Sequence, residues 1–377
     1  MMPSAQLTVD TSAVAWNTRL FAGRTNGHLL AVLKADAFGH GDLAPIVLAG
    51  GATWLGTTSI SDALVLRSRA AETRILSWLN PVDAPFEEAL LADLDLAVPS
   101  EQHLHAISVA AAATGRVARI HLHVDLGINR DGAARGEWSA LCQLAWLLTK
   151  LGRIRVDGIM GHLSSADDPQ DPANRRERML FDNAVRVART HGLRPVVRHL
   201  AATAATLTQP DALYDLSRIG AGLYGIDPAR STTLRPALTL TAPVVSVKRV
   251  PRGSGVGYSH TWSTTRDTNL ALLPLGYGDG LPRTASGRAW VQVRGRRRPI
   301  VGLFSMDQVV VDTGDDQMAP GDVATVFGAG GGGEPTVRDW AEWAGTIDHD
   351  IVVGIGARVQ RRLTPSVAGT VAAEVSA

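Results

Sequence analysis

The sequence predicts an α/β protein that consists of a (β/α)8 barrel followed by a β-rich domain. The first observation is a series of eight short apolar or β-branched runs, most of them followed by a segment with helical spacing. The second is a change after Leu234 to short alternating strands separated by glycine and proline turns. The length of 377 residues suits a large barrel with a second domain.

The barrel elements follow in order along the chain. Strands are expected at Leu29–Leu33, Thr53–Thr57, Arg74–Trp78, Leu94–Val98, Ile120–Val124, Gly158–His162, Val196–His199 and Tyr214–Ile219. The clearest helices are expected at Ser61–Ala70, Ser100–Ala113, Glu137–Lys150 and Asn174–Arg189. Ser61 with Asp62 and Ser100 with Glu101 are typical helix starts, because a side-chain oxygen there accepts from free backbone N–H groups.

The β-rich domain is predicted to contain short strands and one short helix. The strands are expected at Leu238–Val250, Thr268–Leu275, Arg288–Arg294, Ile300–Leu303, Val309–Asp312 and Asp322–Phe327, and the helix at Pro335–Ala344. Gly328–Gly333 is expected to be a surface loop. The basic run Arg294–Arg298 is interpreted as a solvated hairpin tip, with phosphate binding as the weaker alternative.

Composition argues against several classes of protein. The net charge of +1 provides no field that would attract nucleic acid or an anionic membrane. No apolar run approaches the roughly 20 residues of a membrane helix, and no signal peptide is expected. A single cysteine, Cys142, excludes an intramolecular disulfide and a multi-cysteine metal site, so a reducing cytoplasm is expected.

Polar residues at or just beyond the ends of predicted strands are the candidates for chemistry, because barrel enzymes place their sites at the carboxyl ends of the strands. These residues are Lys34, Arg130, His162, His199 and Arg218. A lysine at the end of a buried strand has a depressed pKa, and its neutral amine attacks aldehydes. Position alone also allows a non-catalytic interpretation. Lys34 could be a surface lysine at the rim of the barrel, Arg130 a solvent-facing arginine in a turn, and each histidine a packed, hydrogen-bonded core residue.

The segment Ala31–Gly41 (AVLKADAFGHG) closely resembles the cofactor-lysine signature of bacterial alanine racemases. Further blocks continue the resemblance in family order over nearly the whole chain: Asp125–Gly132, His162–Asp167, His199–Ala205, Arg218–Gly225, Gly255–Tyr258, Leu275–Gly280 and Met306–Gln308. The resemblance implies a barrel with a C-terminal β domain, the cofactor pyridoxal 5'-phosphate, and alanine as the leading substrate.

The resemblance also implies catalytic roles. Lys34 would carry the cofactor as a Schiff base and act as one base, with Tyr258 as the other on the opposite face of the planar intermediate. A phenol has a reference pKa near ~10, so Tyr258 would need cationic neighbours to act as a base at neutral pH. The resemblance implies that His162 and Arg218 are these neighbours. Arg218 would also donate to the pyridine nitrogen and disfavour ring protonation.

The binding roles follow in the same way. Thr203, Gly220 and Ala221 match phosphate-binding positions, and Arg130 would hold the substrate carboxylate. Tyr258, Tyr277, Met306 and Asp307 would reach the active site of a partner, which implies an obligate homodimer. The implied organisation is an N-terminal strand (1–9) joining the C-terminal domain, a cofactor-binding barrel (10–233) and the β-rich domain (234–377).

Four positions depart from the family pattern. Phe38 replaces a usual phosphate-binding tyrosine, and Ala357 replaces a second one. Ala202 replaces a common asparagine, and His123 stands where many members carry a carbamylated lysine that supports the carboxylate-binding arginine. These departures leave the strength of cofactor binding and the choice of substrate open.

Three alternatives remain at this point. A racemase of serine or of a larger amino acid is the strongest of them. A decarboxylase of the same fold would place a cysteine of the second domain at its site, whereas Cys142 lies in a predicted barrel helix. A non-catalytic cofactor carrier would resemble the barrel alone. The sequence leaves open whether the product serves cell-wall synthesis or catabolism.

Overall fold

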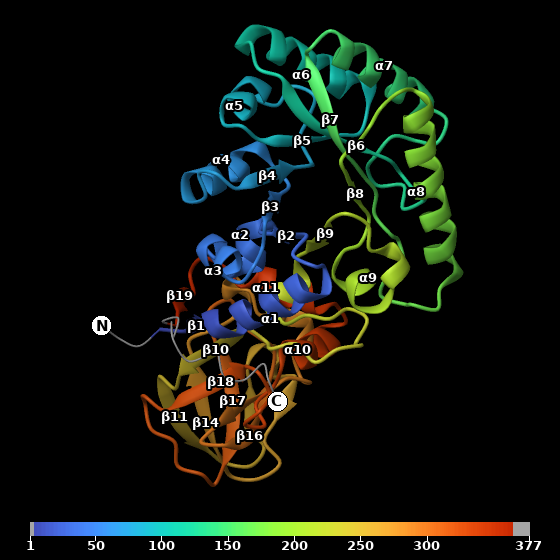
Figure 1. Cartoon of the computed structure of the whole chain (residues 1–377). Coiled ribbons are helices and arrows are strands. Elements are labelled where there is room, and N and C mark those ends of the chain that lie inside the picture. The colour runs from blue at the N-terminus through green and yellow to red at the C-terminus, as the bar shows by residue number, and fades with distance from the viewer. Residues whose placement is uncertain (1–3, 365–377) are drawn as a thin grey trace. The chain divides into compact units, whose positions relative to one another are not determined.

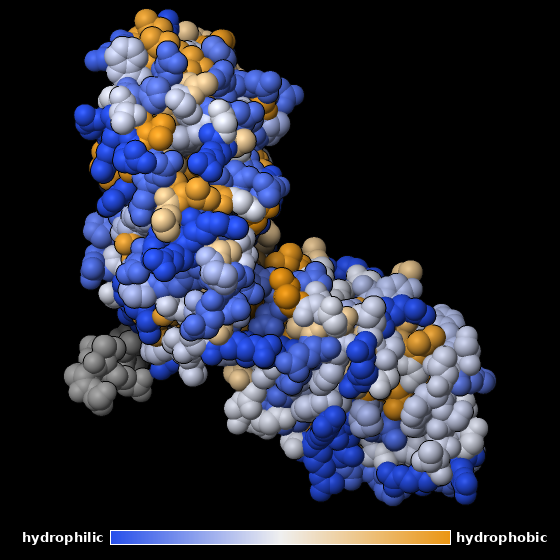
Figure 2. All heavy atoms as spheres, turned by 90° about the vertical axis from the view of Figure 1, so that its right-hand side faces the viewer, coloured by the Kyte–Doolittle hydropathy of each residue, from blue (hydrophilic) through white to orange (hydrophobic). Residues whose placement is uncertain are grey.

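The computed structural model describes residues 4–364, which form two compact units. The barrel unit contains residues 15–37 and 42–234, and the sheet unit contains the described residues 4–14, 38–41 and 235–364. Among the residues described, no helix is long and apolar enough to cross a membrane. On the face shown in Figure 2, hydrophilic side chains predominate and apolar ones are scattered among them.

Eight parallel strands form the core of the barrel unit (Figure 1). Their spatial order is β8-β7-β6-β5-β4-β3-β2-β9, which is chain order around a ring. Most of their residues are buried, as the apolar runs predict. The strands are β2 (Leu29–Val32), β3 (Trp54–Thr57), β4 (Arg74–Ser77), β5 (Asp95–Val98), β6 (Ala118–His123), β7 (Ile154–Met160), β8 (Val197–His199) and β9 (Ser217–Ile219). The predicted barrel is confirmed.

The ring closes between β8 and β9 through single contacts in place of a ladder. Asp215 N–H donates to the carbonyl of Arg198 at 2.9 Å, and Arg218 N–H donates to the carbonyl of Ala201 at 3.0 Å. Ala202 and Arg218 form an isolated parallel bridge. The seam of the barrel therefore runs beside Arg218.

Helices surround the strands of the barrel unit (Figure 1). The four predicted helices are confirmed, each within two residues at either end. Ser59, Ser100 and Asp171 cap three of them by accepting from backbone N–H groups. The helices are α1 (Thr11–Arg24), α3 (Ala44–Ala49), α4 (Ile60–Arg69), α5 (Phe86–Leu91), α6 (Glu101–Thr114), α7 (Trp138–Lys150), α8 (Pro172–Thr190) and α9 (Thr203–Thr208). The six-residue helices are too short to show a helical period in the sequence.

Strand β7 differs from its prediction, because it begins at Ile154 instead of Gly158 and ends at Met160 instead of His162. Two charged residues, Arg155 and Asp157, interrupt the apolar pattern at its start. Asp157 is nevertheless buried, because it accepts hydrogen bonds from Arg155 at 2.5 Å and from Arg74 at 2.6 Å.

The turn after β2 is a left-handed helical turn, α2 (Lys34–Gly39). The φ angles are 53°, 53°, 50° and 56° at Ala35, Asp36, Ala37 and Phe38. Each such residue costs about 1–2 kcal/mol relative to a right-handed turn. Compensating hydrogen bonds run from Ala37 N–H to the carbonyl of Leu33 at 3.0 Å and from Arg361 Nε to the carbonyl of Gly39 at 2.8 Å. A strained, well-held turn thus follows Lys34.

The sheet unit contains a nine-stranded sheet in the order β11-β14-β17-β16-β15-β18-β10-β1-β19. Strand β1 (Gln6–Val9) pairs antiparallel with β10 and parallel with β19, so the first and the last of the described strands lie side by side in one sheet. The other strands are β10 (Leu238–Pro243), β11 (Ser246–Val250), β14 (Thr268–Leu273), β15 (Trp290–Val293), β16 (Arg296–Val301), β17 (Val309–Gly314), β18 (Val323–Phe327) and β19 (Gln360–Leu363). Two short strands, β12 (Gly255–Val256) and β13 (Trp262–Ser263), form a separate hairpin.

The predicted strand Leu238–Val250 is wrong as a single element, because it divides into β10 and β11. Val244 N–H donates to the carbonyl of Asp322 and Val245 N–H to that of Leu272, so the chain crosses from one part of the sheet to another. The helices α10 (Val337–Ala344) and α11 (Asp348–Gly354) follow β18. Trp340 is fully buried, and its indole donates to the carbonyl of Val326 at 2.7 Å.

The basic run starts at the tip of the β15–β16 hairpin with Arg294 and Gly295, and its last three residues belong to β16, so the predicted hairpin tip is confirmed for its first residues only. Arg294 and Gly295 both have positive φ, as a tight hairpin turn requires. Arg294 pairs with Asp322, and Arg296 pairs with Asp316. Acidic side chains thus neutralise the run locally.

The left-handed turn predicts opposite effects of one substitution at two places. Ala35→Gly should stabilise the protein by roughly 0.5–1 kcal/mol, because relief of strain exceeds the entropy that glycine adds to the unfolded chain. Ala113→Gly, at an exposed position in α6, should destabilise it by about 1 kcal/mol. Chemical denaturation of both variants would measure this, and destabilisation of similar size at both positions would contradict the left-handed turn.

Candidate active site

Lys34 lies at the carboxyl end of β2, in the interior wall of the barrel unit. Leu33 N–H still donates to the carbonyl of Gly56 at 2.8 Å, so the sheet continues to the residue before the lysine. Burial, followed by the positive charge of Arg130, lowers the pKa of the Lys34 amine below its ordinary value. The lowered pKa favours the neutral, nucleophilic amine.

Arg218 is buried beside the barrel seam and donates to groups from two other strand ends. Its Nη1 donates to the carbonyl of His199 at 2.7 Å and to His199 Nδ1 at 3.1 Å. Its Nη2 donates to the carbonyl of Gly161 at 2.6 Å and lies 3.3 Å from His162 Nδ1. The guanidinium therefore holds the loops after β7 and β8 together with β9.

The hydrogen-bonded chain continues from Arg218 into the barrel core. His199 Nε2 lies 2.8 Å from His121 Nδ1, and His121 Nε2 lies 3.7 Å from the Asp95 carboxylate. Arginine can only donate, so His199 accepts at Nδ1, donates from Nε2 to His121, and leaves the Nε2–H of His121 directed at Asp95. His199, which accepts at Nδ1, is therefore neutral in this arrangement. Burial and the neighbouring His121 likewise lower the pKa of His199.

The charge of this network resides on Arg218 and not on His162. Burial, followed by the charge of Arg218, lowers the pKa of His162 to about 3, so the imidazole is neutral at neutral pH. Burial and the charge of Arg130 lower the pKa of Arg218 to about 10, which leaves it a cation. The sequence-based expectation of a cationic His162 is therefore not met by the structure.

The segments after β8 and β9 bring Thr203, Gly220 and Ala221 together. Gly222 N–H donates to the Thr203 hydroxyl at 3.1 Å, and a Cβ at Gly222 would lie 2.4 Å from the ring of Phe21, so only glycine fits there. The Tyr224 hydroxyl donates to the carbonyl of Val32 at 2.9 Å, which ties this segment to the strand that carries Lys34.

Arg130 lies in an exposed loop after β6. The Asp125 carboxylate accepts from the N–H groups of Gly127 at 3.0 Å and Asn129 at 3.2 Å, which shapes the loop. His123 Nδ1 is buried and lies 3.4 Å from the Asp131 carboxylate. The proximity of His123 lowers the pKa of Asp131. Where the family pattern has a lysine, this chain thus has a histidine next to an aspartate.

The other predicted site residues lie in the sheet unit. Tyr277 and Met306 adjoin each other, since Tyr277 N–H donates to the carbonyl of Ser305 at 3.1 Å, and the Asp307 carboxylate accepts from Arg358 at 2.6 Å. Tyr258 is 68% exposed in a short hairpin turn. The structure therefore presents two groups of predicted residues, one in each unit.

The other three residues that depart from the family pattern differ in their local surroundings. Ala202 occupies the N-cap of α9 without a side-chain hydrogen bond, which an asparagine would supply. Phe38 is buried with its ring 5.8 Å from that of His349. Ala357 is exposed. Phe38 is therefore a packing residue within the sheet unit.

Sequence reasoning missed His121 and Asp95. The signal was available, because His121 and His123 occupy alternate positions in the predicted strand Ile120–Val124, whose other residues are apolar, and so share one face of it. The partners of His121 lie 26 and 78 residues away in the sequence (Asp95 and His199), and no local pattern joins them.

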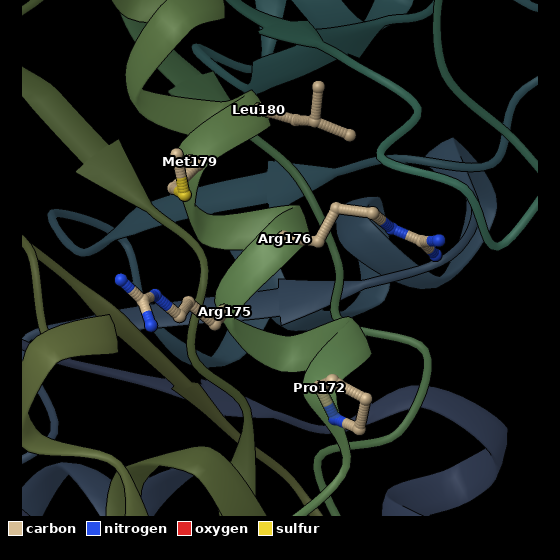
Figure 3. Close-up of a pocket in the computed structure, with 5 residues that line it drawn as sticks. All are labelled: Pro172, Arg175, Arg176, Met179 and Leu180. Atoms are coloured by element: carbon tan, nitrogen blue, oxygen red, sulfur yellow. The ribbon is translucent and has the colours of Figure 1, made fainter.

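A surface hollow lies elsewhere, along α8 (Figure 3). Its volume is about 310 Å³, and its lining residues are Pro172, Arg175, Arg176, Met179 and Leu180. Arg175 and Arg176 project from different sides of the helix in Figure 3. None of the predicted site residues lines this hollow.

Comparison with known proteins identifies the family. The profile of the alanine racemase N-terminal domain matches residues 9–228, and that of the C-terminal domain matches residues 237–363. The alanine racemase of Thermobifida fusca is 46% identical over 97% of this chain and 100% of its own length. That of Streptomyces coelicolor is 42% identical over 95% of each chain.

Solved structures agree with the sequence comparisons. The alanine racemase of Streptomyces lavendulae superposes with a TM-score of 0.94 at 39% identity, over 97% of this chain and 98% of that one. The alanine racemase of Bartonella henselae, solved with covalently bound pyridoxal phosphate, has a TM-score of 0.87 at 25% identity and covers 96% and 99%. The predicted fold and enzyme class are confirmed. Over nearly its whole length, the chain belongs to the alanine racemase family.

Proposed function

We propose that this protein interconverts L- and D-alanine with pyridoxal 5'-phosphate attached to Lys34. The observation that carries the proposal is the amine of Lys34, whose pKa burial lowers, in the same barrel unit as the buried cation Arg218. When bound, the cofactor supplies an aldehyde for the amine and a ring that accepts the electron pair of the Cα–H bond. The naming of the relatives as alanine racemases supports alanine over serine or a larger amino acid.

The residues of the barrel unit fit this cofactor. Lys34 is one of only three lysines in the chain, and the other two, Lys150 and Lys248, lie at the end of α7 and on β11. Arg218 would face the pyridine nitrogen, where a permanent cation disfavours a proton on that nitrogen. The Thr203 hydroxyl and the backbone N–H groups of Gly220 and Ala221 would hold the phosphate. Phe38 would not contribute a hydrogen bond there.

We assign the two proton transfers to Lys34 and Tyr258. In its neutral form the Lys34 amine can take a proton from Cα on one face of the substrate and return it. The Tyr258 hydroxyl would do so on the other face, as inversion at Cα requires. Arg130 would bind the substrate carboxylate, and Tyr277, Met306 and Asp307 would border the substrate.

We further propose a homodimer in which each site uses both chains. The barrel (10–233) would hold the cofactor, and the β-rich domain (234–377), joined by strand 1–9, would reach the site of the partner. The exposure of Tyr258, Tyr277 and Met306 on the sheet unit supports this arrangement, because catalytic side chains need a surrounding site.

A decarboxylase and a cofactor carrier receive no support. The second family profile covers residues 237–363, so the resemblance is not restricted to the barrel. Cys142 is buried in α7, and burial raises its pKa to about 12, which leaves an unreactive thiol.

We place the enzyme in the cytoplasm, where it would supply D-alanine for the cell wall.

Racemisation and cofactor attachment test the proposal directly. The purified protein, loaded with pyridoxal 5'-phosphate, should racemise alanine with a higher kcat/KM than serine or larger amino acids. Borohydride reduction should fix the cofactor on Lys34, as mass spectrometry of peptides would show. Attachment to Lys150 or Lys248, or preference for another amino acid, would overturn the proposal.

Substitution of Tyr258 tests the assignment of the two bases. Tyr258→Phe should lower racemisation by a factor of about 10² or more, because a general acid–base group is lost. Exchange of the Cα proton of D-alanine with solvent should partly survive, since Lys34 serves that enantiomer. Proton exchange can be followed by NMR in deuterated water, and equal loss for both enantiomers would refute the division.

Mixed variants test the shared site. Lys34→Ala and Tyr258→Phe should each be inactive, whereas their mixture should recover up to about one quarter of wild-type activity after subunit exchange. Half of the dimers would then be hybrids, and each hybrid would contain one site with both wild-type residues. Differently tagged chains would verify that subunits exchange. If they exchange and no activity returns, each active site lies within one chain.

A further inference from the structure

Glu177 is a buried acid that plays no part in the chemistry proposed above. It lies on α8, and its side chain is fully buried. The Arg176 guanidinium is 4.0 Å from the carboxylate but is largely exposed, so it provides only weak compensation. A buried carboxylate is costly unless strong hydrogen bonds satisfy it.

Both oxygens of Glu177 are used on a single residue, Ser164. The Ser164 N–H donates to Oε2 at 2.8 Å, and the Ser164 hydroxyl donates to Oε1 at 2.5 Å. Hydrogen bonds to an ionised acceptor are roughly twice as strong as neutral ones. The carboxylate therefore fixes one point of the loop that follows β7.

His162 lies between two residues that hydrogen bonds hold in place, Gly161 and Ser164. Gly161, which precedes it, accepts from Arg218 at 2.6 Å and donates to the carbonyl of His199 at 3.3 Å. Leu163, which follows it, is buried. With Gly161 and Ser164 both held, the short segment between them has little freedom, and His162 Nδ1 stays beside the Arg218 guanidinium.

The carboxylate also adjoins the loop that carries Arg130. A Cβ at Gly127 would lie 3.7 Å from Glu177 Oε1, and a Cβ at Gly161 would lie 2.7 Å from Leu126 Cδ1. The two loops therefore pack against each other next to Glu177. Displacement of Ser164 would therefore also disturb the packing of Leu126 and Gly127, in the loop that carries Arg130.

We propose that Glu177 is a positioning residue that holds His162 in register with Arg218 through Ser164. The proposal rests on the proposed function for its kinetic consequence, because it gives His162 a task within that site. Its structural part, the restraint of residues 161–164, stands on the two hydrogen bonds alone.

Substitutions of graded severity in the loaded enzyme test the proposal. Glu177→Leu removes both acceptors and should lower kcat about tenfold or more, with KM changed less than about threefold. Glu177→Gln should restore most of kcat, since its amide can accept from the N–H and donate to the hydroxyl of Ser164. Ser164→Ala loses only the hydroxyl and should cause a smaller loss of the same kind, which keeps the test informative if Glu177→Leu folds poorly.

Asp171→Ala is the matched control. It removes the cap of the same helix, where Asp171 accepts from Ala173 N–H at 2.8 Å, and should lower the melting temperature without the loss in kcat. Hydrogen exchange measured by mass spectrometry gives a readout without activity. Exchange across residues 161–166 should accelerate in Glu177→Leu, and not in Glu177→Gln.

A double-mutant cycle with His162→Gln separates positioning from general stability. If Glu177 acts through His162, Glu177→Leu should cause little further loss of kcat in that background. Equal losses in both backgrounds, or unchanged exchange across 161–166, would overturn the proposal. Wild-type protein without alanine racemisation would instead refute the proposed function and leave the exchange result to decide the restraint.

Discussion

The buried guanidinium of Arg218 is the interaction on which the barrel unit depends most. Strands β8 and β9 lack a ladder between them, and the same arginine that forms the isolated bridge with Ala202 also donates to the carbonyls of Gly161 and His199. A buried cation is costly without such acceptors. The backbone and the side chain of one residue therefore both contribute to closing the barrel, and the side chain places a permanent positive charge at the ends of its strands.

A chain of polar groups extends this constraint through the barrel. His199 and His121 continue it from Arg218 towards Asp95. Burial raises the pKa of Asp95, but the neighbouring His121 and hydrogen bonds from Arg74 hold that pKa well below its usual range. Because an arginine cannot accept, the direction of every hydrogen bond in this chain is determined. A neutral His199 follows from that direction and from burial, and the guanidinium of Arg218 lies 3.3 Å from His162 Nδ1.

The positions that depart from the family pattern change local support more than the central chemistry. His123 faces Asp131 close to the loop of Arg130, Ala202 leaves a helix start without a side-chain cap, and Phe38 packs on His349 in the sheet unit. None of these departures replaces Lys34 or Arg218 themselves.

The sequence by itself determined the barrel strands, because buried parallel strands are continuous apolar runs, and the long helices, because capping residues and helical spacing are local signals. It also pointed to Lys34 and Arg218, which lie at or next to the ends of such runs, through motifs that resemble those of the alanine racemase family. Only the tertiary structure decided the contact of His121 with His199, 78 residues apart, and the hold of Glu177 on Ser164. It also decided the left-handed turn after Lys34, since four consecutive non-glycine residues with positive φ oppose their local preference and persist only where surrounding contacts hold them.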